Sequence, residues 1–412
     1  LREIRVIYSP MKLARLLLCT SFLFSAASWA NARSTAGSPT PPMGWNSWNW
    51  HGKQDINEQV VRETIDAMVA TGLRDAGYVY VVIDGGWRGT ELGPNGELTI
   101  HEGRFPGGIK PLADYAHERG MKLGLHTVPG SHDCGGDQVG GLGHEEVHVA
   151  QFAEWGIDFI KLDRCVLKTD GGWNEGRIKS VYQKWARLMN EADPEMVLSI
   201  SASEYRHWYP EIAAMARTTL DITARGTDGA IFEREVPRRN HISVMRVADL
   251  NNLQAVHAGN GYWNDPDMLV TGEQGLTEAE QEAHFALWCV MTSPLMLGND
   301  PRDMTDFERD LITNPVAVAI NQDPAEQGRR IFQSGLAEVW VKRMADGQVA
   351  VLLLNRGTEE LEEFHFDASA IAPSAASYAV RDVFAKSTLT SNGVLEAEIG
   401  PRSAKFYLVT PE

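Results

Sequence analysis

Hydrophobic positions in the first three quarters of the chain switch repeatedly between helical spacing and unbroken apolar runs. Val61, Ile65 and Met68 recur at the spacing of one helix face, and residues 79–83 follow as an apolar run. Such a run is typical of a strand buried on both faces. Further strands are expected at residues 122–127, 158–162, 196–201 and 218–222, before Trp263 and around Leu295. About eight such units in roughly 290 residues predict an α/β fold, a (β/α)8 TIM barrel over residues 38–325.

The pattern changes after Pro324. Residues 337–344 and 348–354 alternate or run apolar, and the Asp-Gly pair between them is a hairpin signal. Residues 378–383 and 403–409 indicate two more strands with no long helix between them. These features predict a small C-terminal antiparallel β-sandwich over residues 330–412.

The amino end has the pattern of an export signal. Lys12 and Arg15 precede an apolar stretch over residues 16–27, and small residues lie around Ala30. The alternative, a membrane anchor, needs about 20 apolar residues, more than this stretch offers. We therefore expect residues 1–30 to contain upstream residues and a secretory signal peptide, and the protein to be secreted or periplasmic, with no membrane partner.

Composition excludes several classes of protein. The 412 residues are 43% hydrophobic and 23% charged, an ordinary globular balance. The formal net charge of −17 disfavours a nucleic-acid partner, because the protein would repel phosphates. The four cysteines show no zinc-binding spacing, so no structural zinc is expected.

Carboxylates follow several of the predicted strands. Asp84 ends the second strand, Asp163 the fourth and Asp221 the sixth, while Asp265 and Asp267 follow the seventh. Functional residues of a TIM barrel lie at the carboxyl ends of its strands. Any one of these acids alone can be explained as the cap of the next helix, but helix capping does not explain the whole set. Two facing carboxylates are the groups that glycoside hydrolysis requires.

Two further features bear on this interpretation. Asp265-Pro-Asp267 is also a spacing that holds a metal in nucleotide-sugar transferases, but the chain has no phosphate-binding loop, so a contact of Asp267 with a substrate hydroxyl is favoured. Tryptophans lie near the same strand ends and either stack on sugar rings or belong to the core. They are Trp45, Trp48, Trp87 and Trp263.

Six short motifs, in this order, resemble glycoside hydrolase family 27, the α-galactosidases and α-N-acetylgalactosaminidases. They are TPPMGWNSW (residues 40–48), FPGGI (105–109), GHEE (143–146), KLD (161–163), WNDPDM (263–268) and NQDP (321–324). The resemblance runs from about Thr40 to the carboxyl terminus. It implies a retaining exo-glycosidase that acts on an oligosaccharide or polysaccharide substrate without a metal or organic cofactor.

The resemblance also implies roles for single residues. Asp163 would be the nucleophile, with Lys161 keeping it ionised, and Asp221 the acid/base, beside Arg217. Asp221 must first be protonated, so its surroundings must favour that form. Retention requires the two carboxyl groups to lie roughly 5–5.5 Å apart. Trp48, Asp84, His126, Lys161, Arg217 and Asp267 are the expected substrate-binding residues, and Cys134 and Cys165 the expected disulfide.

The chain departs from the family around the sugar. After Asp84 the family has a second acid that grips the sugar, where this chain has Gly85. Gly86 stands in place of a cysteine whose partner, in the loop after the first strand, is absent as well. His126 replaces a tyrosine, and Arg164 follows the nucleophile. The two are either supporting residues or ligands of an acidic or differently substituted sugar.

The fifth strand departs too. Residues 201–203 stand where the family has Cys-Glu-Trp, whose glutamate contacts the 2-hydroxyl, and Glu204 lies close enough in sequence to compensate. Cys289, in an apolar helical stretch, is expected to be a buried free thiol.

Three hypotheses for the function follow from these observations. The first is an α-galactosidase. The second is the same mechanism on an α-N-acetylgalactosaminide, a β-L-arabinopyranoside, an α-glucan unit or an acidic galactose. The third is a non-catalytic sugar-binding relative.

Overall fold

The computed structural model describes residues 37–412, except 168–169, 171, 173, 228, 234–235, 237–239 and 372–374. The expected signal peptide therefore lies outside the described residues. Within the described part of the chain, no helix combines the length and apolar character that crossing a bilayer requires.

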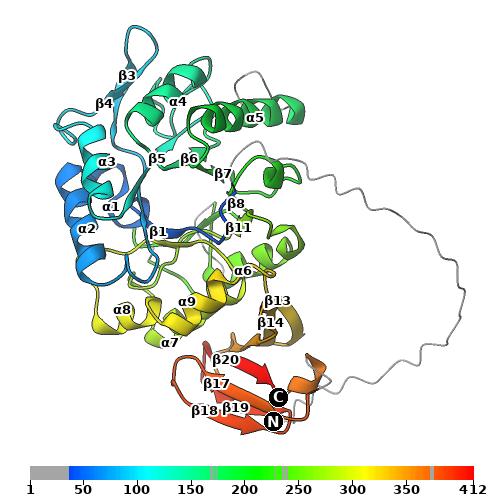
Figure 1. Cartoon of the computed structure of the whole chain (residues 1–412). Helices are drawn as coiled ribbons and strands as arrows, with labels where there is room; N and C mark the ends of the chain where they lie inside the picture. The colour runs from blue at the N-terminus through cyan, green and yellow to red at the C-terminus, as the bar shows by residue number, and fades with distance from the viewer. Residues whose placement is uncertain are drawn as a thin grey trace, which may run out of the picture.

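Eight parallel strands form the barrel (Figure 1). They are β1 (Met43–Asn46), β2 (Tyr80–Ile83), β5 (Lys122–Thr127), β6 (Phe159–Asp163), β7 (Val197–Ser201), β8 (Met215–Arg217), β11 (Trp263–Asp265) and β12 (Leu295–Leu297). Each pairs with its neighbour in chain order, and β1 also pairs with β12. A parallel bridge between Leu269 and Leu297 closes the remaining gap. The predicted TIM barrel is confirmed.

Helices cover the barrel, and their ends are encoded locally. They are α1 (Trp48–Asp55), α2 (Glu58–Ala70), α3 (Lys110–His117), α4 (Glu145–Glu154), α5 (Glu175–Ala192), α6 (Val244–Asn252), α7 (Glu278–Val290), α8 (Asp306–Ile312) and α9 (Pro315–Gln322). The Asn57 side chain caps α2 by accepting from the Val60 amide, and Thr277 forms a capping box with Glu280 on α7. The apolar face of α2 predicted from the sequence is buried.

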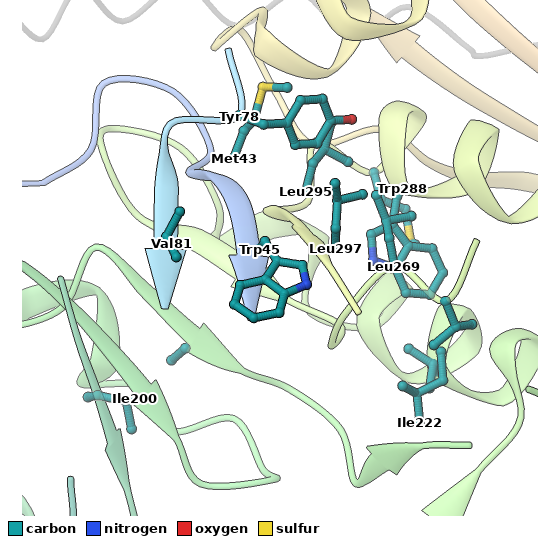
Figure 2. Close-up of a cluster of buried hydrophobic side chains, with 14 of the residues drawn as sticks. Met43, Trp45, Tyr78, Val81, Ile200, Ile222, Leu269, Trp288, Leu295 and Leu297 are labelled. Atoms are coloured by element: carbon teal, nitrogen blue, oxygen red, sulfur yellow. The ribbon is translucent and has the colours of Figure 1, made fainter. Parts of the chain in front are cut away.

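The barrel core is made by the apolar faces of these elements. Figure 2 shows Trp45, Val81 and Leu297 from three neighbouring strands in one buried cluster that also contains Trp288 from α7. Because the strands are short and buried on both faces, their side chains fill the barrel, and polar residues collect where the strands end.

The sixth strand differs from its prediction. It spans Met215–Arg217 rather than 218–222, and Asp221 instead begins β9 (Asp221–Ile222), a two-residue strand paired with β10 (His241–Ile242) outside the barrel. The β-branched run before Asp221 favoured a strand. The fully buried segment Met215–Arg217 just upstream is the one that pairs with β7 and β11. The hairpin β3 (Arg88–Leu92) and β4 (Leu98–Ile100), which projects from the barrel in Figure 1, was not predicted, although the Asn95-Gly96 pair between its strands is a hairpin signal.

The C-terminal domain is the expected antiparallel sandwich. Its six-stranded sheet has the order β13 (Arg329–Ser334), β14 (Ala337–Arg343), β15 (Val349–Asn355), β20 (Ser403–Pro411), β17 (Tyr378–Asp382) and β18 (Thr388–Ser391), and β16 (Leu361–Asp367) pairs with β19 (Val394–Ile399). One face of the large sheet packs against α7, and the other packs against the small sheet (Figure 1). All of β15 is buried as a result.

A buried ion network joins the two domains. Glu338, fully buried on β14, accepts from Arg330 at 2.5 Å, from Arg356 at 3.0 Å and from the Trp340 indole at 2.8 Å. Both arginines also contact Asp249 of barrel helix α6, at 2.7 and 3.0 Å. The network therefore anchors the sandwich on the barrel.

Removing one member of this network should be costly. Glu338→Ala leaves two guanidinium groups short of an acceptor in a buried place, so we expect the free energy of unfolding to fall by about 3 kcal/mol. Urea denaturation measures the change, with Glu362→Ala on the exposed side of β16 as the control. Equal stability of the two variants would contradict the prediction.

Candidate active site

A cavity of about 710 Å³ opens at the carboxyl ends of the barrel strands. Every residue predicted for the site lines it: Trp48, Asp84, His126, Lys161, Asp163, Arg217, Asp221 and Asp267, together with Cys134 and Cys165. They come from strands and loops spread over more than 200 residues of sequence, and barrel closure brings them together.

Lys161 and Asp84 form the tightest ion pair at the cavity floor. Lys161 Nζ lies 2.7 Å from Asp84 Oδ2, which also accepts from Asn46 at 3.1 Å. Burial opposes the charge of Asp84, but Lys161 and nearby His126 outweigh it and hold the pKa of Asp84 well below its ordinary value. The direct partner of Lys161 is therefore Asp84, whereas the sequence had suggested Asp163.

Asp163 ends β6 and keeps an ionised carboxylate. Its Oδ1 accepts from the Arg164 amide at 2.6 Å, and His126 Nε2 lies 3.8 Å from Oδ2. Burial alone would raise its pKa, but His126 and the charge of Lys161 lower it below the usual aspartate value. Lys161 thus still favours the carboxylate of Asp163, through space rather than by contact.

Asp221 and Asp267 share the guanidinium group of Arg217. Arg217 Nη2 is 3.2 Å from Asp221 Oδ1 and 2.9 Å from Asp267 Oδ2. The Ile222 amide also donates to Asp267, at 2.8 Å. The two candidate catalytic acids differ in solvation, since the side chain of Asp221 is 55% exposed and that of Asp163 is 21% exposed.

Backbone hydrogen bonds fix the carboxylates of Asp265, at the end of β11, and Asp267, in the loop after it. The Asp267 amide donates to Asp265 Oδ1 at 2.9 Å, and the backbone of Asp267 has a φ of 113°, which is rare outside glycine. Burial raises the pKa of Asp265 to about 6, although Arg217 opposes the shift. The strained backbone directs the Asp267 carboxylate to Arg217 and the cavity.

Of the four tryptophans singled out from the sequence, Trp48 is the exposed one. It lies at the cavity wall with 44% of its surface exposed. Trp45, Trp87 and Trp263 are fully buried, and their indole N–H groups donate to backbone carbonyls of Asn299, His126 and Ser38. These three belong to the core, and Trp48 is the one of the four that lines the cavity.

Gly85 faces the Trp48 ring. A Cβ placed on Gly85 would lie 3.3 Å from Trp48 Cζ3, so an aspartate there would require the indole to move. The indole thus lines the side of the cavity where the family's second acid would lie.

An arginine links the two loops that lack the family's cysteine bond. Arg104 Nη1 donates to the Lys53 carbonyl at 2.8 Å and to the Gly86 carbonyl at 2.9 Å. Gly86 has a φ of 111°, and a Cβ there would lie 2.5 Å from the Lys53 oxygen. A cysteine at Gly86 would therefore not fit this backbone, and polar contacts take the place of the bond.

Glu204, the residue suggested to compensate for the missing glutamate, is paired with two arginines. It lies 2.6 Å from Arg206 and 3.5 Å from Arg164, and it is not among the residues that line the cavity. Ser201 and Ser203 line the cavity instead. The two arginines hold the Glu204 carboxylate outside the lining of the cavity.

The expected disulfide is present. Cys134 and Cys165 are bonded, with their Cα atoms 5.1 Å apart, and tie the loop after β5 to the loop after β6. His126, Cys134 and Asp163 lie within 4.8 Å of one another, but the bonded Cys134 offers no thiolate to a metal. Cys289 is a buried free thiol, as predicted.

Sequence reasoning missed several cavity residues. Lys53 and Arg88 carry charge into the wall, where Asp133 lies 3.6 Å from the first and 3.8 Å from the second. Asn240 and His241 line the wall near Asp221. Lys53 lies on α1, Arg88 on β3 and the other two at β10, none of them at the end of a predicted barrel strand, and the sequence carried no motif that would have selected them.

This arrangement defines the class of protein, a barrel glycoside hydrolase with two carboxylates in one cavity. Residues 40–323 match the family described as Alpha galactosidase A, and residues 334–409 match the Alpha galactosidase C-terminal beta sandwich domain. The chain belongs to this family, glycoside hydrolase family 27, as its motifs had indicated.

Relatives cover most of the chain. An α-galactosidase of Oryza sativa subsp. japonica is 36% identical over 380 residues, which are 90% of this chain and 85% of that protein. α-Galactosidase A of Cellvibrio japonicus is 36% identical over 80% of this chain and 78% of its own length. The crystal structure of α-galactosidase I from Mortierella vinacea is similar with a TM-score of 0.83 and 27% identity, covering 91% of this chain and 98% of the other.

A buried glutamate beside the cavity makes stability depend on pH. Burial raises the pKa of Glu273 to about 8, although the Arg225 amide and Asn49 donate to it. The folded protein therefore binds this proton more tightly than the unfolded chain does. The stability that Glu273 contributes is fully present below about pH 4.5 and is lost as the pH rises through about 8.

Glu273→Gln cannot ionise and should remove this dependence. We expect the stability of the variant relative to the native protein to increase from about pH 4.5 to about pH 8 and then to level off. Urea midpoints across this range measure it, with Glu362→Gln as the control. A stability difference that does not change with pH would contradict the prediction.

Proposed function

We propose that this protein is a retaining exo-α-galactosidase that releases terminal α-linked galactose from oligosaccharides or polysaccharides. The single observation that carries the proposal is the pairing of a low-pKa, largely buried Asp163 with a solvent-exposed Asp221 in one cavity. One carboxylate is suited to attack carbon, and the other can exchange protons with solvent and substrate.

In the first step Asp163 attacks the anomeric carbon. The glycosidic C–O bond breaks as the new C–O bond forms, and Asp221 transfers its proton to the departing oxygen. Arg217 holds the Asp221 carboxylate in an ion pair at 3.2 Å, and a bound sugar would cover the exposed side of that carboxylate.

In the second step water replaces the leaving group. Asp221 takes a proton from the water as its oxygen attacks the anomeric carbon, and Asp163 leaves as a carboxylate. Arg217 then stabilises Asp221 when it is charged between the two steps. For this double displacement we expect the two carboxyl groups to lie roughly 5–5.5 Å apart.

The cavity floor would hold the terminal sugar. Asp84 and Lys161 present a paired acceptor and donor to sugar hydroxyls, and Asp267 presents a second carboxylate. Trp48 offers an apolar ring surface for a sugar face. His126, whose Nδ1 lacks a hydrogen-bond partner among the described residues, supports Asp163 from the side.

A second candidate keeps the mechanism and changes the sugar. Gly85 and Ala202 stand where the family has acids that contact the sugar, and neither residue supplies a carboxylate. These positions would suit an α-N-acetylgalactosaminide, a β-L-arabinopyranoside, an α-glucan unit or an acidic galactose derivative. The third hypothesis, sugar binding without catalysis, is disfavoured because both acids are retained.

The protein is expected to act outside the cytoplasm, secreted or in a periplasm. The signal pattern before Ala30 directs export, and the disulfide between Cys134 and Cys165 is of a kind rare in reducing compartments.

Loss of the nucleophile should abolish turnover without unfolding the protein. Asp163→Ala removes the attacking oxygen, and we expect kcat/KM on 4-nitrophenyl α-galactoside to fall by about a thousandfold or more. Asp114→Ala, an exposed acid on α3, is the matched control. Near-normal activity of Asp163→Ala, with circular dichroism unchanged, would refute the assignment.

A panel of 4-nitrophenyl glycosides decides the sugar. We expect the α-galactoside to give the highest kcat/KM, with the α-N-acetylgalactosaminide, β-L-arabinopyranoside, α-glucoside and α-galacturonide as competitors. Equal or better turnover of any competitor would overturn galactose specificity while leaving the retaining mechanism in place.

A further inference from the structure

A short strand pair outside the barrel fixes what lies beside Asp221. In the parallel pair β9–β10, His241 is in register with Asp221, and Ile242 with Ile222. Paired residues of neighbouring strands point to the same face of a sheet. Asp221 and His241 both line the cavity, so that shared face is the cavity side.

Four described residues between β9 and β10 line the cavity next to Asp221. They are Ala224, Gly226, Thr227 and Asn240, and the first two have no polar side chain. The Thr227 hydroxyl is already used in a turn, where it donates to the Ala224 carbonyl at 2.8 Å. His241 Nδ1 is buried and, among the described residues, has no hydrogen-bond partner.

The chemistry of the reaction indicates which part of the substrate this wall faces. An acid that protonates the departing oxygen must lie beside the leaving group rather than beneath the retained sugar. A residue held next to that acid therefore faces the leaving group as well. The cavity volume of about 710 Å³ also leaves space beyond a single sugar ring.

We propose that His241 binds the leaving group and forms, with the 224–227 segment, a subsite for the second sugar of the substrate. This inference rests on the proposed glycosidase function. The imidazole donates to or accepts from a hydroxyl of that sugar. An aryl leaving group has no such hydroxyl, so His241 discriminates oligosaccharides from aryl glycosides.

The test compares two leaving groups on one sugar. His241→Ala should lower kcat/KM for melibiose, in which galactose is α-linked to glucose, by about tenfold, the value of one hydrogen bond. The same variant should change kcat/KM for 4-nitrophenyl α-galactoside by less than about twofold. His241→Asn, which keeps a donor and an acceptor, should recover part of the melibiose activity.

Controls separate the possible failures. His365→Gln, on β16 of the sandwich, should leave both substrates unchanged. Equal losses on melibiose and the aryl glycoside would overturn the proposal, because they would indicate a structural role of His241 in the β9–β10 pair. If the native protein prefers another sugar, the same comparison is made on glycosides of that sugar, so the subsite is tested independently of galactose specificity.

Discussion

The closed ring of parallel strands is the constraint on which the site depends. Parallel strands all end on the same rim, so each residue that follows a strand joins the residues that follow its neighbours. The bridge between Leu269 and Leu297 matters for this reason, because it brings the loop after β11 to β12 and closes the ring. Asp84, Asp163 and Asp267 share one cavity as a direct consequence.

Collecting acids in one place requires charge compensation, and the rim supplies it with two buried cations. Lys161 neutralises Asp84 and favours the ionised form of Asp163, while Arg217 is divided between Asp221 and Asp267. The division suits catalysis, because a guanidinium with two partners can keep one ion pair while the other carboxylate gains or loses a proton.

Much of the fold and of the site could be predicted because its determinants are local. Apolar runs mark the strands, and the acids directly after them, such as Asp84 and Asp163, reach the rim by topology alone. Asp221 was assigned to a barrel strand, but it lies four residues beyond Arg217, on β9. Its place depends on pairing with β10, which lies 20 residues away along the chain.

Other features of the cavity could not be predicted because they depend on contacts between elements rather than on local sequence pattern. His241 reaches the cavity through that pairing, and Glu204 is turned away by two arginines that no sequence pattern linked to it. The role of Arg104 was equally hidden, because the sequence indicated the loss of a cysteine bond but not what replaced it.

The replacement of that bond by Arg104 changes how the cavity should respond to its surroundings. Two carbonyl contacts of a guanidinium are indifferent to thiols and oxidants, so the link between the loops after β1 and β2 holds in reducing and oxidising media alike. Cys134–Cys165, next to Asp163, is then the redox-sensitive link in the described part of the rim. A reductant that reaches the cavity would therefore loosen the nucleophile loop and leave the opposite wall, with Trp48 and Gly85, in place.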